Sequence, residues 1–562
     1  MGGIIGKLSF ERDETLARHV LEQMLDAVSH RGLADRDIHV APGIALGSSE
    51  VACVSSVRVV ADARLVNARE LRGELRRLGG DVDTASDAHL MAHAYHAWGS
   101  RCFAKLEGPF SCAIWDARSR RLLLARDPLG IRPLYFALLH GHGVAFASEI
   151  NALFHDPGVT RDYSPAAIDA YLALGYVPAP LTAFRRVSKV EPGQFLEVDG
   201  RRLHAEQYWD PPPADGRGSI ERTAHNLEAQ LRMATHEDTA PGSMILCSGD
   251  VASSVLAWAA PPDAGAAVMV AVEQEPGDLL RARSALTALG HIPEIEVAAI
   301  NPALLASDLA ARLDEPLADP AAVAQYATFL AAALHGTHAV AAHGATALFD
   351  GAKRHTVWDG DQRRSIYTRA FAWEVRDINP RSRYQELCDV RASSDPFDRS
   401  AYVQLRSVLP ESSLMAADRT SLAAGITLRL PFLDRRFVEF AAAIPSSVKR
   451  AGAGPLPLLR RILEGKVPRE FLPRPTPRTA VPSWLERTIA AMVPRLLLAS
   501  RFDGRGIVSR PALRTLWAEH RSGRRNHALR FWSLLMLEFW FREFIDGDAA
   551  EDPLEYVVLK AA

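Results

Sequence analysis

A short apolar strand, a tight polar loop and an apolar helix follow one another between residues 243 and 260, and this succession constrains the fold more than any other feature. The pattern then repeats along the chain. Strands alternating with helices of this length predict a parallel sheet covered by helices. The expected strands are Ser243–Cys247, Ala266–Val272, Glu294–Ala299 and Thr337–Ala342, and the expected helices are Ile220–Thr235, Val255–Ala260, Leu279–Leu289 and Ala321–Ala333.

The preceding part of the chain has a different pattern, in which short apolar runs alternate with turn residues and helical periodicity lies outside these runs. An α+β layered domain fits this order. Its expected strands are Val51–Ala61, Phe110–Trp115, Arg121–Ala125, Leu134–Leu139 and Gly143–Ala147, and its expected helices are Glu14–Val28, Ala68–Leu78 and Ala88–Trp98.

The stiff polar stretch Pro211–Gly216 suits a linker, which predicts two domains, residues 1–210 and 211–562. The end of the second domain reads as mostly helical. Within it, Leu529–Phe544 carries Trp, Phe and Leu at spacings of three and four, which predicts a helix that faces the core.

The net charge and the cysteine content exclude several classes of partner and site. A net charge of -2 and a pI near 6.8 argue against nucleic acid or an acidic membrane surface as the main partner. A small-molecule or peptide ligand is expected instead. The 5 cysteines are scattered without metal-site or disulfide spacing, and no apolar run is long enough to span a membrane, so we expect a cytoplasmic protein.

Seven motifs are distributed over both parts of the chain: Ser29–Gly32, Leu106–Phe110, Ala125–Tyr135, Phe146–Glu149, Asp314–Pro320, Asp418–Arg419 and Leu428–Asp434. Together they resemble the glutamine-hydrolysing asparagine synthetase family. This resemblance implies an N-terminal nucleophile-hydrolase-like sandwich, followed by a PP-loop ATP-pyrophosphatase domain with a helical C-terminal part. It also implies ATP and Mg²⁺ as cofactors if the protein is active, and leaves a homodimer open.

The first domain departs from the family at its glutaminase site. The resemblance implies a nucleophilic cysteine where Gly2 stands, and glycine offers no nucleophile. It also implies an oxyanion-binding Asn-Gly-Glu segment where Asp62-Ala63-Arg64 stands, and a carboxylate repels an oxyanion. Asp87 alone matches the substrate-binding Asp. We therefore predict no glutamine hydrolysis, as in the lasso-peptide cyclases and β-lactam synthetases, a divergent branch that this chain resembles.

The nucleotide loop keeps only part of the family pattern Ser-Gly-Gly-x-Asp-Ser-Ser. Asp250 replaces the second Gly, and Ala252 replaces the magnesium-binding Asp. Asp250 is either a displaced Mg²⁺ ligand or the cap of the following helix. The positions that match, and so are expected to bind nucleotide together with Asp250, are Ser248, Gly249, Ser253 and Ser254.

Two further elements of the family's synthetase site are altered. In the stretch Ala341–Gly351 the resemblance implies two aspartates and a catalytic glutamate, where His343, Thr346 and Ala347 stand. Thr476 replaces the family's Lys, with Arg478 two residues further on. His343 is either a structural residue or part of new chemistry. Other residues expected beside the pocket are Asp314, Asp319 and Gly344.

These departures favour a homologue with impaired or absent catalysis that acts by binding a small molecule, a peptide or a partner enzyme. One alternative is an active ATP-dependent amide ligase of the lasso-cyclase type, working on a precursor peptide without glutamine hydrolysis. The other is an asparagine synthetase that uses free ammonia.

Overall fold

The computed structural model describes residues 2–32, 35–82, 86–214, 219–261, 264–265, 283–291, 305–350, 357–391, 393, 395–454, 456–468 and 482–547 with their side chains. For residues 267–271, 293–297 and 302–304 it describes the backbone alone.

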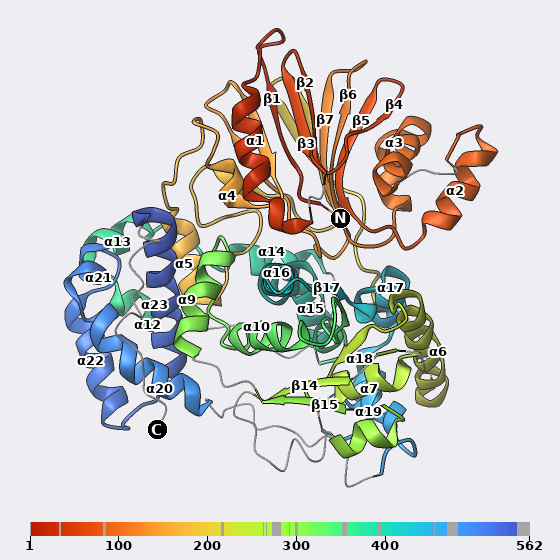
Figure 1. Cartoon of the computed structure of the whole chain (residues 1–562). Coiled ribbons are helices and arrows are strands. Elements are labelled where there is room, and N and C mark those ends of the chain that lie inside the picture. The colour runs from red at the N-terminus through yellow and green to blue at the C-terminus, as the bar shows by residue number, and fades with distance from the viewer. Residues whose placement is uncertain are drawn as a thin grey trace.

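Two antiparallel sheets lie face to face in the N-terminal domain, at the top of Figure 1. The strand order is β10-β8-β9-β1-β3-β2 in the first and β12-β11-β7-β6-β5-β4 in the second. The bounds are β1 Ile5–Ser9, β2 Asp37–Ala41, β3 Ile44–Ser48, β4 Ala52–Val54, β5 Val57–Ala63, β6 Phe110–Asp116, β7 Arg121–Arg126, β8 Tyr135–Leu138, β9 Gly143–Ala147, β10 Val187–Lys189, β11 Gln194–Asp199 and β12 Arg202–Gln207.

Strand β6 shows why the layers form, because successive side chains of a strand point to opposite faces. Ala113 and Trp115 belong to the core between the two sheets. Cys112 and Ile114 belong to the core under the helices α2 and α3. Both faces of the strand are therefore buried. Helices cover the outer faces of the sheets: α1 Arg18–Ala27 and α4 Ile150–Leu153 on the first, and α2 Ala68–Arg77 and α3 Asp87–Trp98 on the second. Helix α5 Pro165–Leu174 lies below the sheets, toward the helical part at the left of Figure 1.

The second domain contains a parallel sheet with the strand order β15-β14-β13-β16-β17. Helices pack around it, and its core includes the fully buried Phe437 and Leu458. The bounds are β13 Met244–Leu246, β14 Ala267–Ala271, β15 Pro293–Val297, β16 His338–Val340, β17 Thr427–Arg429, α6 Ile220–Asp238, α7 Val251–Ala259, α9 Pro302–Arg312, α10 Ala321–Ala332, α11 Ala345–Phe349, α16 Met415–Ala423, α17 Arg435–Ala443, α18 Ser446–Lys449 and α19 Pro457–Leu463.

A helical part, blue at the left of Figure 1, completes the chain and packs against α5 of the first domain. Tyr171 of α5 donates a 2.8 Å hydrogen bond to the carbonyl of Ser533. Helix α23 is buried from Phe531 to Trp540, as predicted for a helix that faces the core, although Leu529 in its first turn is exposed. The remaining helices are α12 Gly360–Ile366, α13 Arg369–Glu374, α14 Ser382–Val390, α15 Pro396–Val403, α20 Ser483–Met492, α21 Ser500–Gly504, α22 Arg510–Arg521 and α23 Ala528–Trp540, with π-helical turns over Gln404–Leu414, Val493–Leu497 and Phe541–Asp546.

The predicted fold class is confirmed, but some local predictions were wrong. The expected single strand Val51–Ala61 is the hairpin β4–β5, because the chain turns at Ser55, whose φ is 55°. Helix α7 begins at Val251 rather than Val255, since Asp250 caps it. The expected helix Leu279–Leu289 lies partly outside the described residues. None of the described helices combines the length and apolarity that crossing a bilayer requires.

Candidate functional site

The segment that begins at Asp62 faces the second domain. Asp62 lies near the end of β5, which pairs with β6, and its side chain is 2% exposed. It accepts hydrogen bonds from Arg31 Nε at 3.3 Å and from Arg31 Nη2 at 3.0 Å. The carboxylate therefore holds a cation of its own chain.

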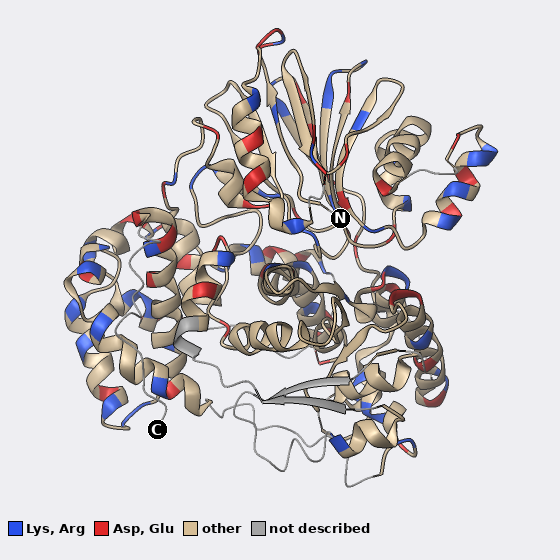
Figure 2. Ribbon diagram, viewed as in Figure 1, with Lys and Arg blue, Asp and Glu red and all other residues tan. Residues whose placement is uncertain are grey.

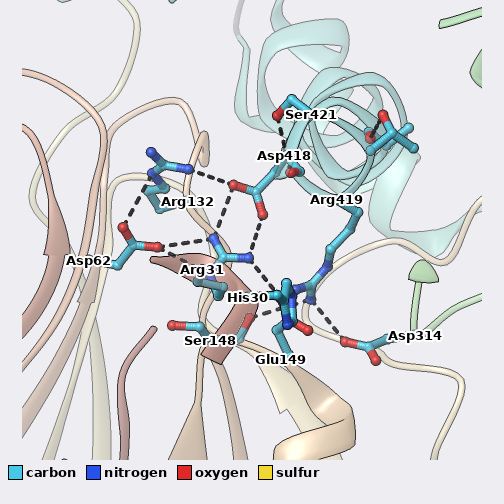
Figure 3. Close-up of polar contacts among 12 residues, drawn as sticks. His30, Arg31, Asp62, Arg132, Ser148, Glu149, Asp314, Asp418, Arg419 and Ser421 are labelled. Atoms are coloured by element: carbon cyan, nitrogen blue, oxygen red, sulfur yellow. Dashed lines mark hydrogen bonds and ion pairs between the residues drawn. The ribbon is translucent and has the colours of Figure 1, made fainter. Parts of the chain in front are cut away.

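Arg31 bridges the two domains, as Figure 3 shows. Its guanidinium group donates to Asp418 on α16, from Nη1 to Oδ2 at 2.8 Å and from Nη2 to Oδ1 at 3.1 Å. Arg132 donates to the same carboxylate at 2.7 Å. Nearby, Arg419 of the second domain pairs with Glu149 of the first and, at 2.9 Å, with Asp314. We call this set of seven side chains the interdomain ion network: Arg31, Asp62, Arg132, Glu149, Asp314, Asp418 and Arg419.

The charges in this network stabilise one another against burial. Burial alone would raise the pKa of the Asp418 carboxyl, but the guanidinium groups of Arg31 and Arg132 outweigh this effect and hold that pKa well below its usual value. Burial would lower the pKa of Arg31, and Asp418, Asp62 and Glu149 raise it. Asp418 and Arg31 are therefore both ionised at neutral pH.

Residues near Asp62 also hold parts of the chain in place. Arg64 pairs with Asp238, which lies on α6 of the second domain. Asp87 accepts a 2.9 Å hydrogen bond from the Leu65 amide, and burial raises the pKa of its carboxyl. Gly2 is buried just before β1. The predicted residues Asp62 and Asp87 thus each hold part of the chain in place, Asp62 through Arg31 and Asp87 through the Leu65 amide.

A cavity of about 440 Å³ opens in the second domain. The loops that follow the adjacent parallel strands β13 and β16 supply part of its lining, and α10 and the π-helical turn Gln404–Leu414 supply more. Of the residues predicted from sequence, the lining includes Ser248, Asp250, Ala252, Ser253, Asp319, His343, Gly344, Thr346 and Ala347.

Asp250 caps helix α7, as one of its two interpretations predicted. Its Oδ1 accepts a 2.7 Å hydrogen bond from the Ser253 amide, and its φ and ψ are extended. The loop reverses at Gly249, whose φ is 77°. A backbone amide at a helix N-terminus can donate a hydrogen bond to a bound anion. Here the Ser253 amide already donates to the carboxylate of Asp250.

The cavity is poor in positive charge. Asp250 and Asp319 are its charged lining residues within the described part of the chain, and both are exposed carboxylates. Helix α10, which forms one wall, is tan along its length in Figure 2 because its sequence has no charged residue. A triphosphate needs positive side chains around it, and the described residues that line this cavity include no lysine or arginine.

His343 lies after the end of β16, as expected. Of its two ring nitrogens, only Nε2 has a hydrogen-bond partner among the described residues. Its Nε2 is 2.9 Å from the Gln325 amide nitrogen, which can only donate, so the ring proton is on Nδ1. Nδ1 is buried, and no described residue accepts its hydrogen bond. Burial lowers the pKa of His343 to about 4, against the opposing charge of Asp250, so the ring is neutral at pH 7.

The other predicted residues lie elsewhere. Asp314 belongs to the interdomain ion network, where Oδ2 also accepts from the Ile150 amide at 2.9 Å. Gly249 and Ser254 are part of the loop and of α7 but are not among the residues that line the cavity. Thr476 and Arg478 lie outside the described residues.

Comparisons with known proteins agree with this architecture. The family described as "Glutamine amidotransferase domain" matches residues 1–209, and the family described as "Asparagine synthase" matches residues 222–542. The chain belongs to the asparagine synthase family. Its two domains are therefore the N-terminal nucleophile-hydrolase-like sandwich and the PP-loop domain with a helical C-terminal part.

Members of the asparagine synthase family with similar sequences span most of this chain. A putative asparagine synthetase [glutamine-hydrolyzing] of Mycobacterium tuberculosis is 27% identical, over 87% of this chain and 84% of that protein. Asparagine synthetase [glutamine-hydrolyzing] 1 of Bacillus subtilis is 24% identical, over 89% and 88%. A solved glutamine phosphoribosylpyrophosphate amidotransferase of B. subtilis covers 52% of this chain and 65% of its own at 15% identity, with a TM-score of 0.28, which is too low to add to these findings.

Sequence reasoning missed the interdomain ion network as a unit. It used Arg31, Arg132 and Asp418 to identify the asparagine synthase family and did not predict that they meet. One signal was present, because a carboxylate at position 62, in a strand whose other residues except Arg58 are apolar, requires a cation as partner if it is buried. The contact of Gln325 with His343 left no comparable signal, since the two residues lie 18 positions apart on different elements.

Proposed function

We propose that this chain is a non-catalytic member of the asparagine synthase family, which binds a small amine-bearing ligand, an amino acid or a peptide, in the cavity beside β13 and β16. On this proposal it is related to the members that have abandoned ammonia transfer, such as the lasso-peptide cyclases and β-lactam synthetases. The glutaminase domain serves as a structural partner of the second domain.

The carboxylate of Asp250 on the Ser253 amide carries this proposal. It puts a negative charge where the family binds pyrophosphate, and ATP would have to displace it or approach it closely. Two unit charges of like sign 4 Å apart repel by about 4 kcal/mol at an effective dielectric constant of 20. No cation among the described lining residues offsets this repulsion.

The residues present do not fit ATP and Mg²⁺. Ala252, Thr346 and Ala347 offer no carboxylate, and the described residues contain no group of three or more His, Cys, Asp and Glu side chains that could hold a metal ion. They fit an amine better. Asp250 and Asp319 can accept hydrogen bonds from an ammonium group, and the uncharged ring of His343 lines the same cavity.

Nucleotide binding and pyrophosphate exchange test this proposal on the whole chain. We expect no heat of binding and no rise in melting temperature with ATP and Mg²⁺, and no ATP–pyrophosphate exchange with aspartate or with a mixture of amino acids. Amino acids or short peptides should raise the melting temperature, and His343→Phe should abolish that rise. Amino-acid-dependent exchange would instead show an active amide ligase, either of the lasso-cyclase type or an asparagine synthetase that uses free ammonia.

A further inference from the structure

A second pocket lies where the two domains of the chain meet. It has a volume of about 60 Å³, whereas a single water needs roughly 10–15 Å³ by this measure, so a small organic molecule can enter. Arg64 and Pro109 line it from the first domain, and Ser421 and Arg429 from the second. None of the described residues lines both this interdomain pocket and the cavity beside β13.

The carboxylates around the interdomain pocket already have partners. Asp238 pairs with Arg64, and its Oδ2 accepts a 3.1 Å hydrogen bond from the Leu430 amide. Asp418 binds Arg31 and Arg132 within the interdomain ion network. The remaining two carboxylates, Glu237 and Asp434, bind groups of the second domain. Glu237 pairs with Arg436 at 2.6 Å, and Asp434 accepts a 3.0 Å hydrogen bond from the Phe437 amide.

Arg429 differs from these groups. It is half-buried at the end of β17, and its guanidinium group makes no hydrogen bond or ion pair within the described part of the chain. Burial and the nearby charges of Arg64 and Arg132 lower its pKa to about 10 against the opposing charge of Asp238, which leaves it charged at neutral pH. A half-buried guanidinium group without a partner is costly, and an anion would relieve that cost.

The rest of the interdomain pocket is largely apolar. Aliphatic side chains of α16 and of the segment that follows it form much of the wall, among them Leu422, Ile426, Leu428 and Leu433. A ligand that fits therefore has an anionic head for Arg429 and a short apolar tail for this wall. Guanidinium groups bind carboxylates through two parallel hydrogen bonds, which suits this geometry.

We infer that the interdomain pocket binds a small carboxylic acid with a short apolar tail, and that Arg429 receives its carboxylate. The inference does not depend on the proposed function, because the two sites share no described lining residue. If butyrate-type acids fail to bind the interdomain pocket, the proposed ligand of the larger cavity is unaffected. If the larger cavity binds no amine, the inference about the interdomain pocket still stands.

Thermal unfolding and calorimetry of the full chain with butyrate test the inference, with butyramide as the uncharged isostere and inorganic phosphate as the anion without a tail. Butyrate should bind in a saturable way and raise the melting temperature, whereas butyramide should not. Phosphate should bind at least about ten-fold more weakly than butyrate. Equal effects of butyrate and butyramide, or of butyrate and phosphate, would overturn the inference.

Three variants locate the binding. Arg429→Gln should raise the Kd for butyrate at least about ten-fold, since it removes a charged hydrogen-bond donor. Arg18→Gln, an exposed arginine on α1, should leave the Kd unchanged. Thr427→Glu keeps Arg429 and adds a carboxylate on the same face of β17, because residues two apart on a strand point the same way. It should raise the melting temperature without ligand and abolish the butyrate effect. Unchanged butyrate binding in Thr427→Glu would overturn the inference even if Arg429→Gln failed to fold.

Discussion

Gly344 shows at the scale of one residue how the synthetase-site loop is held. It follows His343 in the cavity wall and has a φ of 94°, which favours glycine. A Cβ built at this position would lie 2.3 Å from Cδ2 of Leu433, whose side chain is buried. Backbone conformation and packing therefore both exclude a side chain here, whatever the cavity binds.

Gly344→Ala should lower the free energy of unfolding by about 1–3 kcal/mol, because alanine is strained at this φ and its methyl group would displace Leu433. Gly73→Ala is a matched control, since Gly73 lies inside α2 with nothing within 4 Å of an added Cβ. The control should gain about 0.5–1 kcal/mol. Urea unfolding of both variants checks this, and an unchanged midpoint for Gly344→Ala would contradict it.

At the scale of an element, helix α7 starts where it does because Asp250 satisfies one of its free amides. The segment Val251–Ala259 is apolar apart from Ser253 and Ser254 and is buried on most sides, so periodicity alone placed its start four residues late. The side chain of Asp250 that caps the helix also contributes one of the two negative charges in the lining of the adjacent cavity. A change at this residue therefore alters both the helix cap and the electrostatics of the site.

Asp250→Ala should cost about 1 kcal/mol of stability through loss of the cap, while Asp250→Asn should cost less, because asparagine caps about as well as aspartate. Melting temperatures measured with and without Mg²⁺ check the role of this residue. A Mg²⁺-dependent rise in the native chain that is absent from Asp250→Asn would show that Asp250 binds the metal ion instead.

The elements were predictable to the extent that they rest on local pattern. Strands such as Gly143–Ala147 agree residue for residue with β9, and helix Ala68–Leu78 differs from α2 by one residue. The turn at Ser55 was missed, since serine at a positive φ depends on the tertiary context of the hairpin. The cavity lining followed from the resemblance, but Arg31 and Asp418 lie 387 residues apart, and no local pattern brings them together.

On the scale of the whole molecule, buried charge connects the domains along with apolar packing. Arg31 and Arg132 from the first domain and Asp418 from the second are nearly inaccessible to solvent. Removing one partner of a buried ion pair typically costs about 3–5 kcal/mol, since the other charge is left uncompensated. The two domains are therefore expected to unfold together.

Acid should weaken this connection. The pKa of Asp418 is lowered in the folded chain, so its ionised form contributes stability above the unfolded value of about 3.9, and this contribution is lost as the pH falls through the lower folded value. Asp418→Asn should be less stable by about 3 kcal/mol at pH 7 and lose less between pH 5 and pH 3 than the native chain.

Urea unfolding at pH 7, 5, 4 and 3 measures this difference. Asp26→Asn serves as the control, because Asp26 is exposed and its pairing with Arg36 is worth little. Parallel loss of stability in the native chain and in Asp418→Asn at every pH would contradict the role given to Asp418.

The pairing of Arg31 with Asp62 and Asp418 also bears on how such a chain evolves. A domain can be deleted at no cost to fitness only if its neighbour folds without it. Here a deletion of residues 1–210 would remove Arg31 and Arg132 from the buried carboxylate of Asp418 and Glu149 from Arg419, and selection for a folded second domain would preserve the first. The first domain is thus kept for the folding of its neighbour, whatever chemistry it does or does not perform.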